Sequence, residues 1–239
     1  TFKGQLGVQR MKTPLCTRLG IELPIVQAPM GGAGGPALAA AVCNAGGLGM
    51  LALWHADADT MRRQIRETRA LTSRPFGMNL NLEFRQEKRL AVCLEERVPI
   101  ISFFWRDPID LVPRAKEGGA IVMHTVGSAA DAKRAVDAGV DIVIAQGWEA
   151  GGHVRGTVAT MPLIPAVVDA VSPAPVVAAG GIADGRGLAA ALALGASGVW
   201  IGTRFLASNE AAIHPRYRER ILQANETDAI YLEDLFDAR

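Results

Sequence analysis

The stretch PVVAAGGIADGRGLAAALALGASGVWIGT, residues 175–203, holds two short aliphatic runs with a helix-length segment between them. The runs are PVVAAGG at 175–181 and GVWIGT at 198–203. Asp184 is a residue type that caps the start of a helix, and Gly195 is typical of the position just past its end. A strand, a helix and a second strand joined by short connections indicate parallel strands with a right-handed crossover. The stretch therefore predicts one βαβ unit.

The same pattern recurs along the chain. Aliphatic runs without strict polar alternation are typical of strands that are buried on both faces. Segments of helical length separate the runs, and Ser128 and Gly139 mark the start and end of one such segment. Another segment offers Asp59 or Thr60 as its N-cap, with apolar residues spaced for one buried face at Met61, Ile65 and Leu71. Eight runs occur, at residues 24–30, 48–53, 76–80, 100–105, 120–126, 141–147, 175–181 and 198–203.

Eight strands alternating with helices predict an α/β fold, a closed (β/α)8 or TIM barrel of parallel strands. An open doubly wound sheet is the alternative, but such a sheet would rarely need eight evenly spaced strands. We expect the barrel to span residues 21–207 and residues 1–20 to cap its bottom. Residues 208–239 are expected to form a C-terminal helical segment that begins a substrate lid, with RYRERI at 216–221 as a solvated helix face.

Composition excludes several classes of partner. The chain is 49% hydrophobic and its net charge is +1, from 25 basic and 24 acidic residues, which does not suit nucleic acid or an anionic membrane as the main partner. No apolar run is long enough to span a bilayer. The three cysteines lie far apart and show no metal-binding spacing, so a reduced, cytoplasmic protein without a metal site is expected.

Glycines gather at the predicted carboxyl ends of the strands, where barrels of this kind carry their active sites. The loops after the seventh and eighth strands are the usual phosphate site, and Gly180, Gly181, Gly202 and Thr203 fall there. The alternative is that these glycines only permit tight turns. Because two such turns fall at the phosphate position, we favour phosphate binding over a role in turns alone.

The segment GGAGGPA, residues 31–37, matches a dinucleotide fingerprint after a strand. That fingerprint also needs an acidic residue at the end of the second strand. Asp57 and Asp59 are the candidates, but both fall where a helix cap is expected, and eight barrel strands leave no room for a separate dinucleotide-binding domain. We interpret the segment as a turn that lets backbone approach a planar ligand, with Pro36 starting the next helix.

Four histidines are present, and their contexts differ. His55 and His214 are expected at the surface. His124 lies within the fifth predicted strand and either belongs to the core or faces a ligand. His153 follows the sixth strand in a glycine-rich loop on the active face, AQGWEAGGHVRG at 145–156. A lone histidine usually has no special role, but in this place it is a candidate general base.

Five ordered motifs resemble a known family: PIVQAPM, FGMNL, AQGWEAGGH, AAGGIADGRG and IGTRF, between Thr13 and Pro215. Together they are similar to the nitronate monooxygenases, which are FMN-dependent barrel enzymes. Flavin-dependent enoyl-acyl-carrier-protein reductases share the glycine–histidine loop and the last two motifs. The resemblance implies that FMN is held by Gln27, Ala28, Met30, Asn79, Gln146, Gly151, Gly180, Gly181, Trp200, Ile201, Gly202 and Thr203.

The resemblance also implies a reaction. His153 would take the α-proton of a nitroalkane, and the nitronate would be oxidised by FMN and O2 to a carbonyl compound and nitrite. Two alternatives stay open: an NAD(P)H-dependent reductase of a quinone or an enoyl thioester, and a non-catalytic FMN-binding barrel. A homodimer is the oligomer to test for.

The sequence departs from the family in two places. The loop continues GGHVRG rather than GGHRG, so the role of Arg155 is open. Family members usually continue for several tens of residues past the end of this sequence, so we expect the C-terminal extension to be incomplete.

Overall fold

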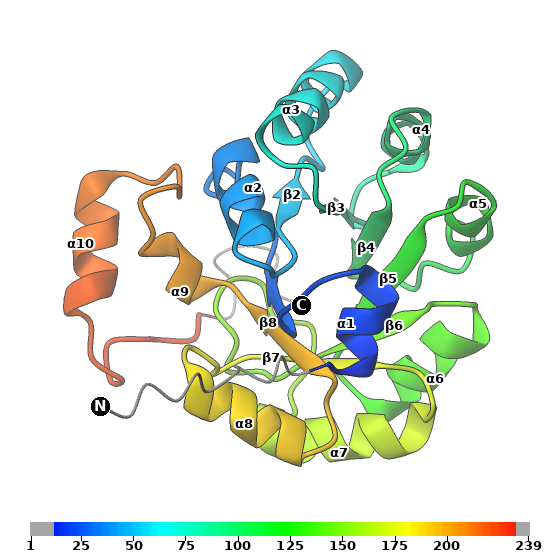
Figure 1. Cartoon of the computed structure of the whole chain (residues 1–239). Helices are drawn as coiled ribbons and strands as arrows, with labels where there is room; N and C mark the ends of the chain where they lie inside the picture. Colours follow the sequence, from blue (N-terminus) through cyan, green and yellow to red (C-terminus); the bar gives the residue numbers. More distant parts are fainter. Residues whose placement is uncertain (1–11, 233–239) are drawn as a thin grey trace, which may run out of the picture.

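The computed structural model describes residues 12–232, which form a ring of eight parallel strands enclosed by helices (Figure 1). All eight predicted strands are present, and the predicted parallel TIM barrel is confirmed. The sheet order is β1-β8-β7-β6-β5-β4-β3-β2. The strands are β1 (Ile25–Gln27), β2 (Met50–Ala52), β3 (Gly77–Asn81), β4 (Ile100–Phe104), β5 (Ile121–Val126), β6 (Ile142–Gln146), β7 (Val176–Ala179) and β8 (Gly198–Ile201).

The ring closes between β1 and β2 by a single isolated bridge, Val26 to Leu48. Gln27 N donates to Leu48 O at 2.8 Å, and Leu48 N donates to Ile25 O at 2.9 Å. By comparison, β3 and β4 pair over five residues. The sheet is thus a barrel with one weakly paired junction, which we call the β1–β2 seam, and not an open doubly wound sheet.

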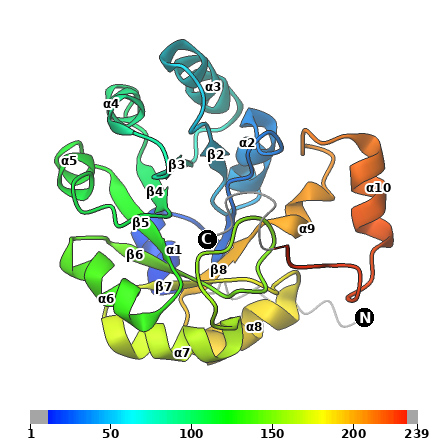
Figure 2. The ribbon, with the colours of Figure 1, turned by 180° about the vertical axis from the view of Figure 1, so that it is seen from behind.

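Helices surround the barrel in sequence order, as Figures 1 and 2 show from opposite sides. Figure 2 also shows the connection from β6 to α7 crossing one end of the barrel. The helices are α1 (Pro14–Leu19), α2 (Pro36–Asn44), α3 (Ala58–Leu71), α4 (Glu87–Glu95), α5 (Val112–Glu117), α6 (Ala129–Asp137), α7 (Thr160–Val171), α8 (Gly185–Ala193), α9 (Thr203–Leu206) and α10 (Pro215–Gln223).

Most predicted helix ends are where the sequence placed them. The side chain of Ser128 accepts a hydrogen bond from Asp131 N, and Asp184 caps α8 in the same way. Gly139 and Gly195 follow their helices with φ of +97° and +95°, a conformation that favours glycine.

The predicted N-cap of α3 was wrong, and of the three residues predicted for its buried face, Met61 and Ile65 are confirmed and Leu71 is not. Asp57, not Asp59 or Thr60, is its N-cap, and its side chain accepts from Thr60 N at 2.7 Å. Leu71 is 48% exposed, whereas Thr68 is fully buried with Met61 and Ile65. Residues 61, 65 and 68 follow the helical repeat, and Thr68 satisfies its hydroxyl by donating to Gln64 O at 2.8 Å, so a polar residue fits the buried face.

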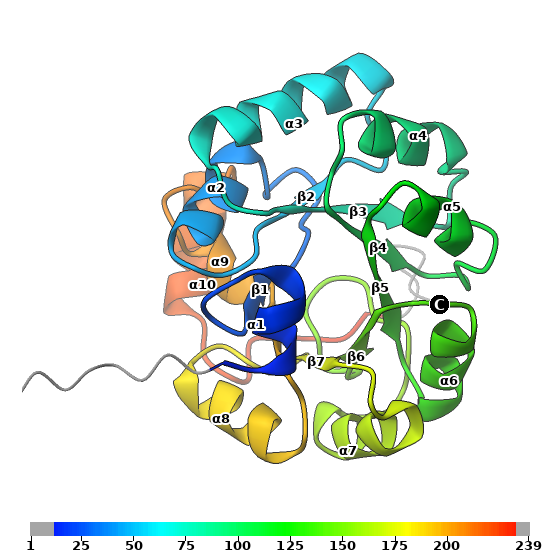
Figure 3. The same ribbon diagram turned by 45° about the vertical axis from the view of Figure 1, so that its right-hand side comes forward.

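The core has two main layers. One lies between the strands and the outer helices, and the other fills the barrel interior. Leu15 and Leu19 of α1 join the interior layer with Met50, Ile100 and Ile142. Figures 1 and 3 show α1 lying across the end of the barrel at which the strands begin. The cap predicted for residues 1–20 stays a prediction, because residues 1–11 lie outside the described part.

After β8 the chain leaves the barrel pattern. The short helix α9 follows, then α10, which stands outside the ring of helices and buries no residue (Figure 1). The predicted solvated face at 216–221 is therefore confirmed. Tyr231 comes back to the β6–α7 loop, where its ring meets Trp148 edge-on at 6.1 Å. Residues 233–239 of the predicted lid segment lie outside the described part. Among the described helices, none has the length and apolar character needed to cross a membrane.

Candidate functional site

The loops after β6, β7 and β8 touch one another at the carboxyl end of the barrel. A Cβ atom added to Gly151 would lie 2.5 Å from Thr203 Oγ1, and one added to Gly180 would lie 2.7 Å from Thr160 Oγ1. These distances leave no room for a side chain. Glycine at Gly151 and Gly180 is thus needed for the three loops to meet, and the meeting point is the predicted phosphate site.

Backbone donors remain open at this meeting point. Gly181 has φ of +66° and is exposed, as is Thr203. Within residues 12–232, the amides of Gly181 and Thr203 donate to no other group. Exposed N–H groups in loops of this kind form anion-binding concavities. The residues present therefore fit a phosphate group, as the predicted FMN requires.

The start of α7 is already occupied by a carboxylate of the chain itself. Glu149 accepts from Thr160 N through both oxygens, at 3.0 and 3.2 Å. The Thr160 hydroxyl donates in turn to the carbonyls of Ala179 and Gly180. The backbone N–H groups open to an added anion are consequently those of the loops after β7 and β8, and not those at the N-terminus of α7.

Two residues expected around a flavin ring are buried in the barrel wall. Asn79 is 4% exposed and its Nδ2 donates to Ser102 Oγ at 2.8 Å. Gln27 is fully buried; its Nε2 donates to Ala28 O, and its Oε1 accepts from Met50 N at 3.0 Å. As it stands, the Gln27 side chain connects β1 to β2. The flavin contacts predicted for these residues stay predictions.

Trp200 and Ile201, both predicted to contact the cofactor, point their side chains to opposite faces of β8. Trp200 packs against the interior core layer, whereas Ile201 packs outward among residues under α8. Only the backbone of Ile201 therefore faces the loop end. A Cβ atom added to Gly202 would lie 3.5 Å from Ala28 Cβ and 3.9 Å from Met30 Sδ, which is ordinary contact.

Gln146 holds the loop that carries His153. Its Nε2 donates to His153 O at 2.9 Å, and its Oε1 accepts from Arg155 N at 3.2 Å. The His153 side chain is exposed, and its ring meets the indole of Trp105 edge-on at 6.1 Å. The structure thus places the candidate base at an open position, beside an aromatic ring from the loop after β4.

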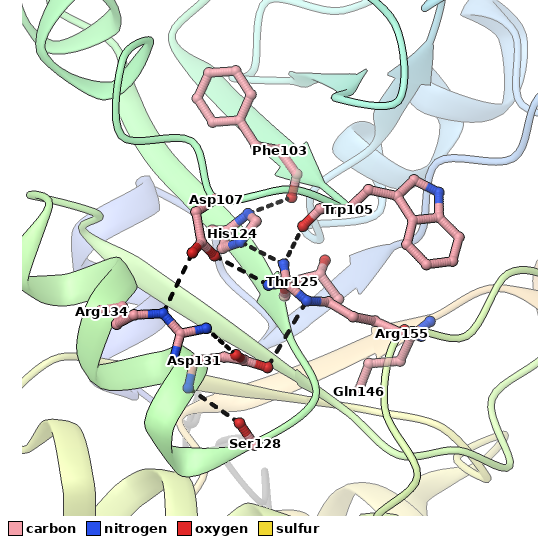
Figure 4. Close-up of polar contacts among 10 residues, drawn as sticks. All are labelled: Phe103, Trp105, Asp107, His124, Thr125, Ser128, Asp131, Arg134, Gln146 and Arg155. Carbon is pink, nitrogen blue, oxygen red and sulfur yellow. Dashed lines mark hydrogen bonds and ion pairs between the residues drawn. The ribbon is translucent and has the colours of Figure 1, made fainter. Parts of the chain in front are cut away.

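A polar network that sequence reasoning missed joins the loops after β4, β5 and β6 (Figure 4). Arg155 Nη2 donates to Asp107 Oδ1 at 3.1 Å, and Arg134 Nε pairs with Asp107 Oδ2 at 3.3 Å. Burial alone would raise the pKa of Asp107, but hydrogen bonds from these two arginines lower it below its ordinary value. Asp131 also pairs with both arginines. The two carboxylates balance the two guanidinium charges.

His124 belongs to this network and to the core. It is fully buried, and its Nδ1 lies 3.1 Å from Phe103 O. Its Nε2 lies 2.8 Å from Arg155 Nη1, which can only donate, so Nε2 accepts and Nδ1 carries the proton. Burial and the Arg155 charge lower the pKa of His124 to about 4. Of the two roles left open for His124, the structure favours the core.

Comparisons with known proteins agree with this arrangement. The sequence model of the family described as "Nitronate monooxygenase" matches residues 12–88 and 81–239. The chain is 38% identical to a nitronate monooxygenase of Paraburkholderia phytofirmans, over 90% of this chain and 71% of that protein. It is 43% identical to the "(3aS,4S,5R,7aS)-5-hydroxy-7a-methyl-1-oxo-octahydro-1H-indene-4-carboxyl-CoA dehydrogenase" of Mycobacterium tuberculosis, over 90% of this chain. The chain spans 61% of the length of that dehydrogenase.

Solved structures show the same fold. FabK from Thermotoga maritima superposes with a TM-score of 0.87 and 45% identity, over 90% of this chain and 68% of that one. A nitroalkane oxidase from Streptomyces ansochromogenes superposes with a TM-score of 0.79 and 36% identity, over 85% of this chain and 71% of that one.

Proposed function

The chain belongs to the nitronate monooxygenase family, and from that membership we propose that its barrel binds FMN and oxidises alkyl nitronates with O2 to a carbonyl compound and nitrite. One observation carries the proposal. An exposed histidine, His153, shares its loop with Gly151, which lies against Thr203 at the anion-binding meeting point. The candidate base would thereby share its loop with a glycine that borders the proposed phosphate site.

The cofactor would be held by residues of three loops. Gly181, Gly202 and Thr203 would offer open backbone to the phosphate, and Asn79, on the inner wall at β3, would contact the flavin. When bound, FMN would supply the redox chemistry, which takes electrons from the substrate and passes them to O2. The chain supplies position, the exclusion of water and the electrostatic surroundings.

His153 would act on substrates that still carry the α-proton. An imidazole nitrogen of His153 takes that proton, and the nitronate formed is an anion. The positively charged imidazolium that results attracts this anion. A nitronate supplied directly needs no proton removal, so His153 only binds it.

A second candidate reaction rests on the degree of similarity. The chain is 43–45% identical to a CoA dehydrogenase and to FabK, but 34–38% identical to nitronate monooxygenases. The same barrel would then act on a thioester of coenzyme A or a similar carrier, with NAD(P)H as a partner of the flavin. The third reading is a barrel that binds FMN without catalysis.

Anaerobic mixing of the flavin-loaded protein separates the three. Loss of the flavin's yellow absorbance on adding a nitronate, with none on adding NADH or NADPH, is the result expected for nitronate oxidation. Loss with NAD(P)H alone would replace the proposal by the reductase. No loss with either would leave only binding, and a protein that takes up no FMN would remove all three.

A further inference from the structure

Trp105 has an unusual backbone for a large residue. Its φ is +74°, in the left-handed region, and it follows β4 directly. Bulky side chains rarely adopt this conformation, and such residues persist only where the surrounding structure holds them. The Trp105 indole is 6% exposed and its edge faces the ring of His153. What holds Trp105 therefore also sets the surface against which His153 rests.

Arg155 is the group that holds it. Arg155 Nη1 donates to Trp105 O, and it also lies 3.1 Å from Thr125 O and 2.8 Å from His124 Nε2. Nη2 is taken by Asp107. The side chain is 14% exposed. Because Nη1 and Nη2 already donate to the chain and the side chain is largely buried, a direct role in binding an anionic substrate does not fit (Figure 4).

The arginine also lies two residues after His153, in a segment that is fixed on both sides. Arg155 N donates to Gln146 Oε1 at the start of the loop. The next residue, Gly156, packs against Gly127 so closely that a Cβ atom on either would lie within 2.7 Å of the other's Cα. The loop therefore returns to the barrel at Arg155, while residues 151–153 stay exposed.

We propose that Arg155 is a positioning residue for His153. Its guanidinium fixes the end of the loop by backbone and side-chain bonds, and through Trp105 O it keeps the indole in place beside the imidazole. This assignment gives a role to the residue at which the chain departs from its family's motif. The catalytic consequence rests on the proposed function, but the structural consequence does not.

The structure offers a matched control. Arg134 pairs with the same two carboxylates, Asp107 and Asp131, but no bond joins it to Trp105 or to the β6–α7 loop among the described residues. Arg155→Met and Arg134→Met each remove one guanidinium from the network. Arg155→Lys keeps the charge, yet a single ammonium cannot reach Trp105 O, His124 Nε2 and Asp107 together.

The first measurement is amide hydrogen exchange over residues 147–156, which needs no substrate. Arg155→Met is expected to speed exchange in this loop by about tenfold or more, with Arg155→Lys between it and the wild type and Arg134→Met near the wild type. Wild-type exchange in Arg155→Met would overturn the proposal. If Arg155→Met does not fold, wild-type exchange in Arg155→Lys would overturn it equally.

The second measurement separates positioning from plain stability. On a neutral nitroalkane, Arg155→Met should lower kcat by about 10- to 100-fold, because a misplaced base reacts slowly. Its KM and its activity on preformed nitronate should change little. Trp105→Gly, which suits the backbone but removes the indole, should show the same split. Equal losses on both substrate forms would overturn the positioning role. Wild-type protein inactive on every nitronate would instead refute the proposed function and leave the exchange result standing.

Discussion

Two histidines at the carboxyl ends of neighbouring strands have opposite surroundings. His124 is fully buried, bonded on both ring nitrogens and uncharged at neutral pH. His153 is exposed in a glycine-rich loop, and among residues 12–232 only the Trp105 ring lies against its own ring. A ring with both nitrogens engaged cannot exchange a proton with substrate, whereas an open one can. The contrast supports His153, and not His124, as the proposed base.

Substitution of His153 tests that role. In His153→Asn the base is lost while a polar side chain of similar size remains. We expect turnover of neutral nitroalkanes to fall by about two to four orders of magnitude, the usual effect of a positioned general base. Turnover of preformed nitronate should fall much less, and the FMN content should not change. Oxygen consumption with each substrate form measures both. Matching losses on the two forms would leave His153 as a binding group.

Substitution of His124 tests the buried ring through its pH dependence. The folded pKa of about 4 lies below the ordinary 6.5, so the unfolded chain takes up a proton first as the pH falls. The stabilising contribution is complete above pH 6.5 and is lost toward pH 4. Wild-type protein should lose about 2 kcal/mol of unfolding free energy from this group between pH 7 and pH 5.

His124→Gln lacks that titration, so its unfolding free energy should vary less over the same range, as urea unfolding at the two pH values would show. His55→Gln, at an exposed position, is the control and should follow the wild type. An unchanged pH dependence in His124→Gln would mean that the ring is protonated in the fold or open to water.

Of the residues in the candidate site, some could be predicted from the sequence and others could not. His153 could be found because a histidine among glycines after a buried strand is a local pattern. The network around Arg155 could not, because Asp107, His124 and Asp131 lie on other elements, 24 to 48 positions away, and only the folded barrel brings them together. No spacing rule connects residues of successive barrel loops.

At the scale of single elements, the loop after β8 gives the cleanest test of the phosphate cradle. Gly181 has φ of +66°, so valine there would strain the backbone whether or not a ligand binds. Gly202 has φ of −108° and ordinary space around a Cβ atom. Gly202→Val should therefore fold normally and yet bind FMN at least about tenfold more weakly, because the side chain occupies the ligand's approach.

The FMN content after purification and the affinity in a fluorescence titration measure this effect, with thermal unfolding as the check on folding. Gly185→Ala, at a glycine with open space in the first turn of α8, is a control that should keep the wild-type affinity. Wild-type FMN affinity in Gly202→Val would show that Gly202 only turns the chain.

Helices were easier to foresee than their buried faces. Ser128 and Asp184 cap helices as the sequence predicts, because a capping bond is local. In α3 the buried face holds Thr68 while Leu71 is exposed, since the last turn of the helix has already left the core. Apolar character alone could not show this, because a threonine that bonds the preceding turn packs as well as an aliphatic residue.

For the whole molecule, Asp141 secures the bottom of the barrel. It pairs with Arg18 of α1 and with Lys116 of α5, and its other oxygen accepts from Val122 N at 2.9 Å. Burial would raise the pKa of Asp141, but these partners more than offset that effect and lower it. Its stabilising contribution is present above the unfolded pKa and is lost as the pH falls below it.

Asp141→Asn should lower the unfolding free energy by about 1–2 kcal/mol at pH 7. The difference from wild type should shrink as the pH falls below about 4, because Asp141 of the unfolded wild-type chain is protonated first and the folded carboxylate only at lower pH. Urea unfolding at both pH values measures this. Asp137→Asn removes an exposed pair with Lys133 and should have almost no effect. A constant difference at all pH values would assign the loss to shape and not to charge.

The barrel as a whole was predictable because each strand is a continuous aliphatic run, and burial on both faces leaves a strong trace in the sequence. The packing of the region after β8 was not predictable from the sequence. There an apolar cavity of about 310 Å³ lies between α2 and α9, lined by residues such as Leu38, Val42 and Phe205. A cavity depends on the path of the backbone, and an aliphatic run in the sequence does not reveal that path.

The weakly paired junction between β1 and β2 is where we expect the barrel to open first, and the Gln27 side chain holds it closed. Where β1 and β2 scarcely pair, its amide supplies a hydrogen bond that a longer ladder would otherwise make. In Gln27→Met that bond is gone while the volume is kept. Transient opening should then become easier at this junction alone, so the Met50 amide should exchange with solvent deuterium earlier than amides of β4 or β5. Uniform acceleration around the ring would mean that the barrel opens only by unfolding completely.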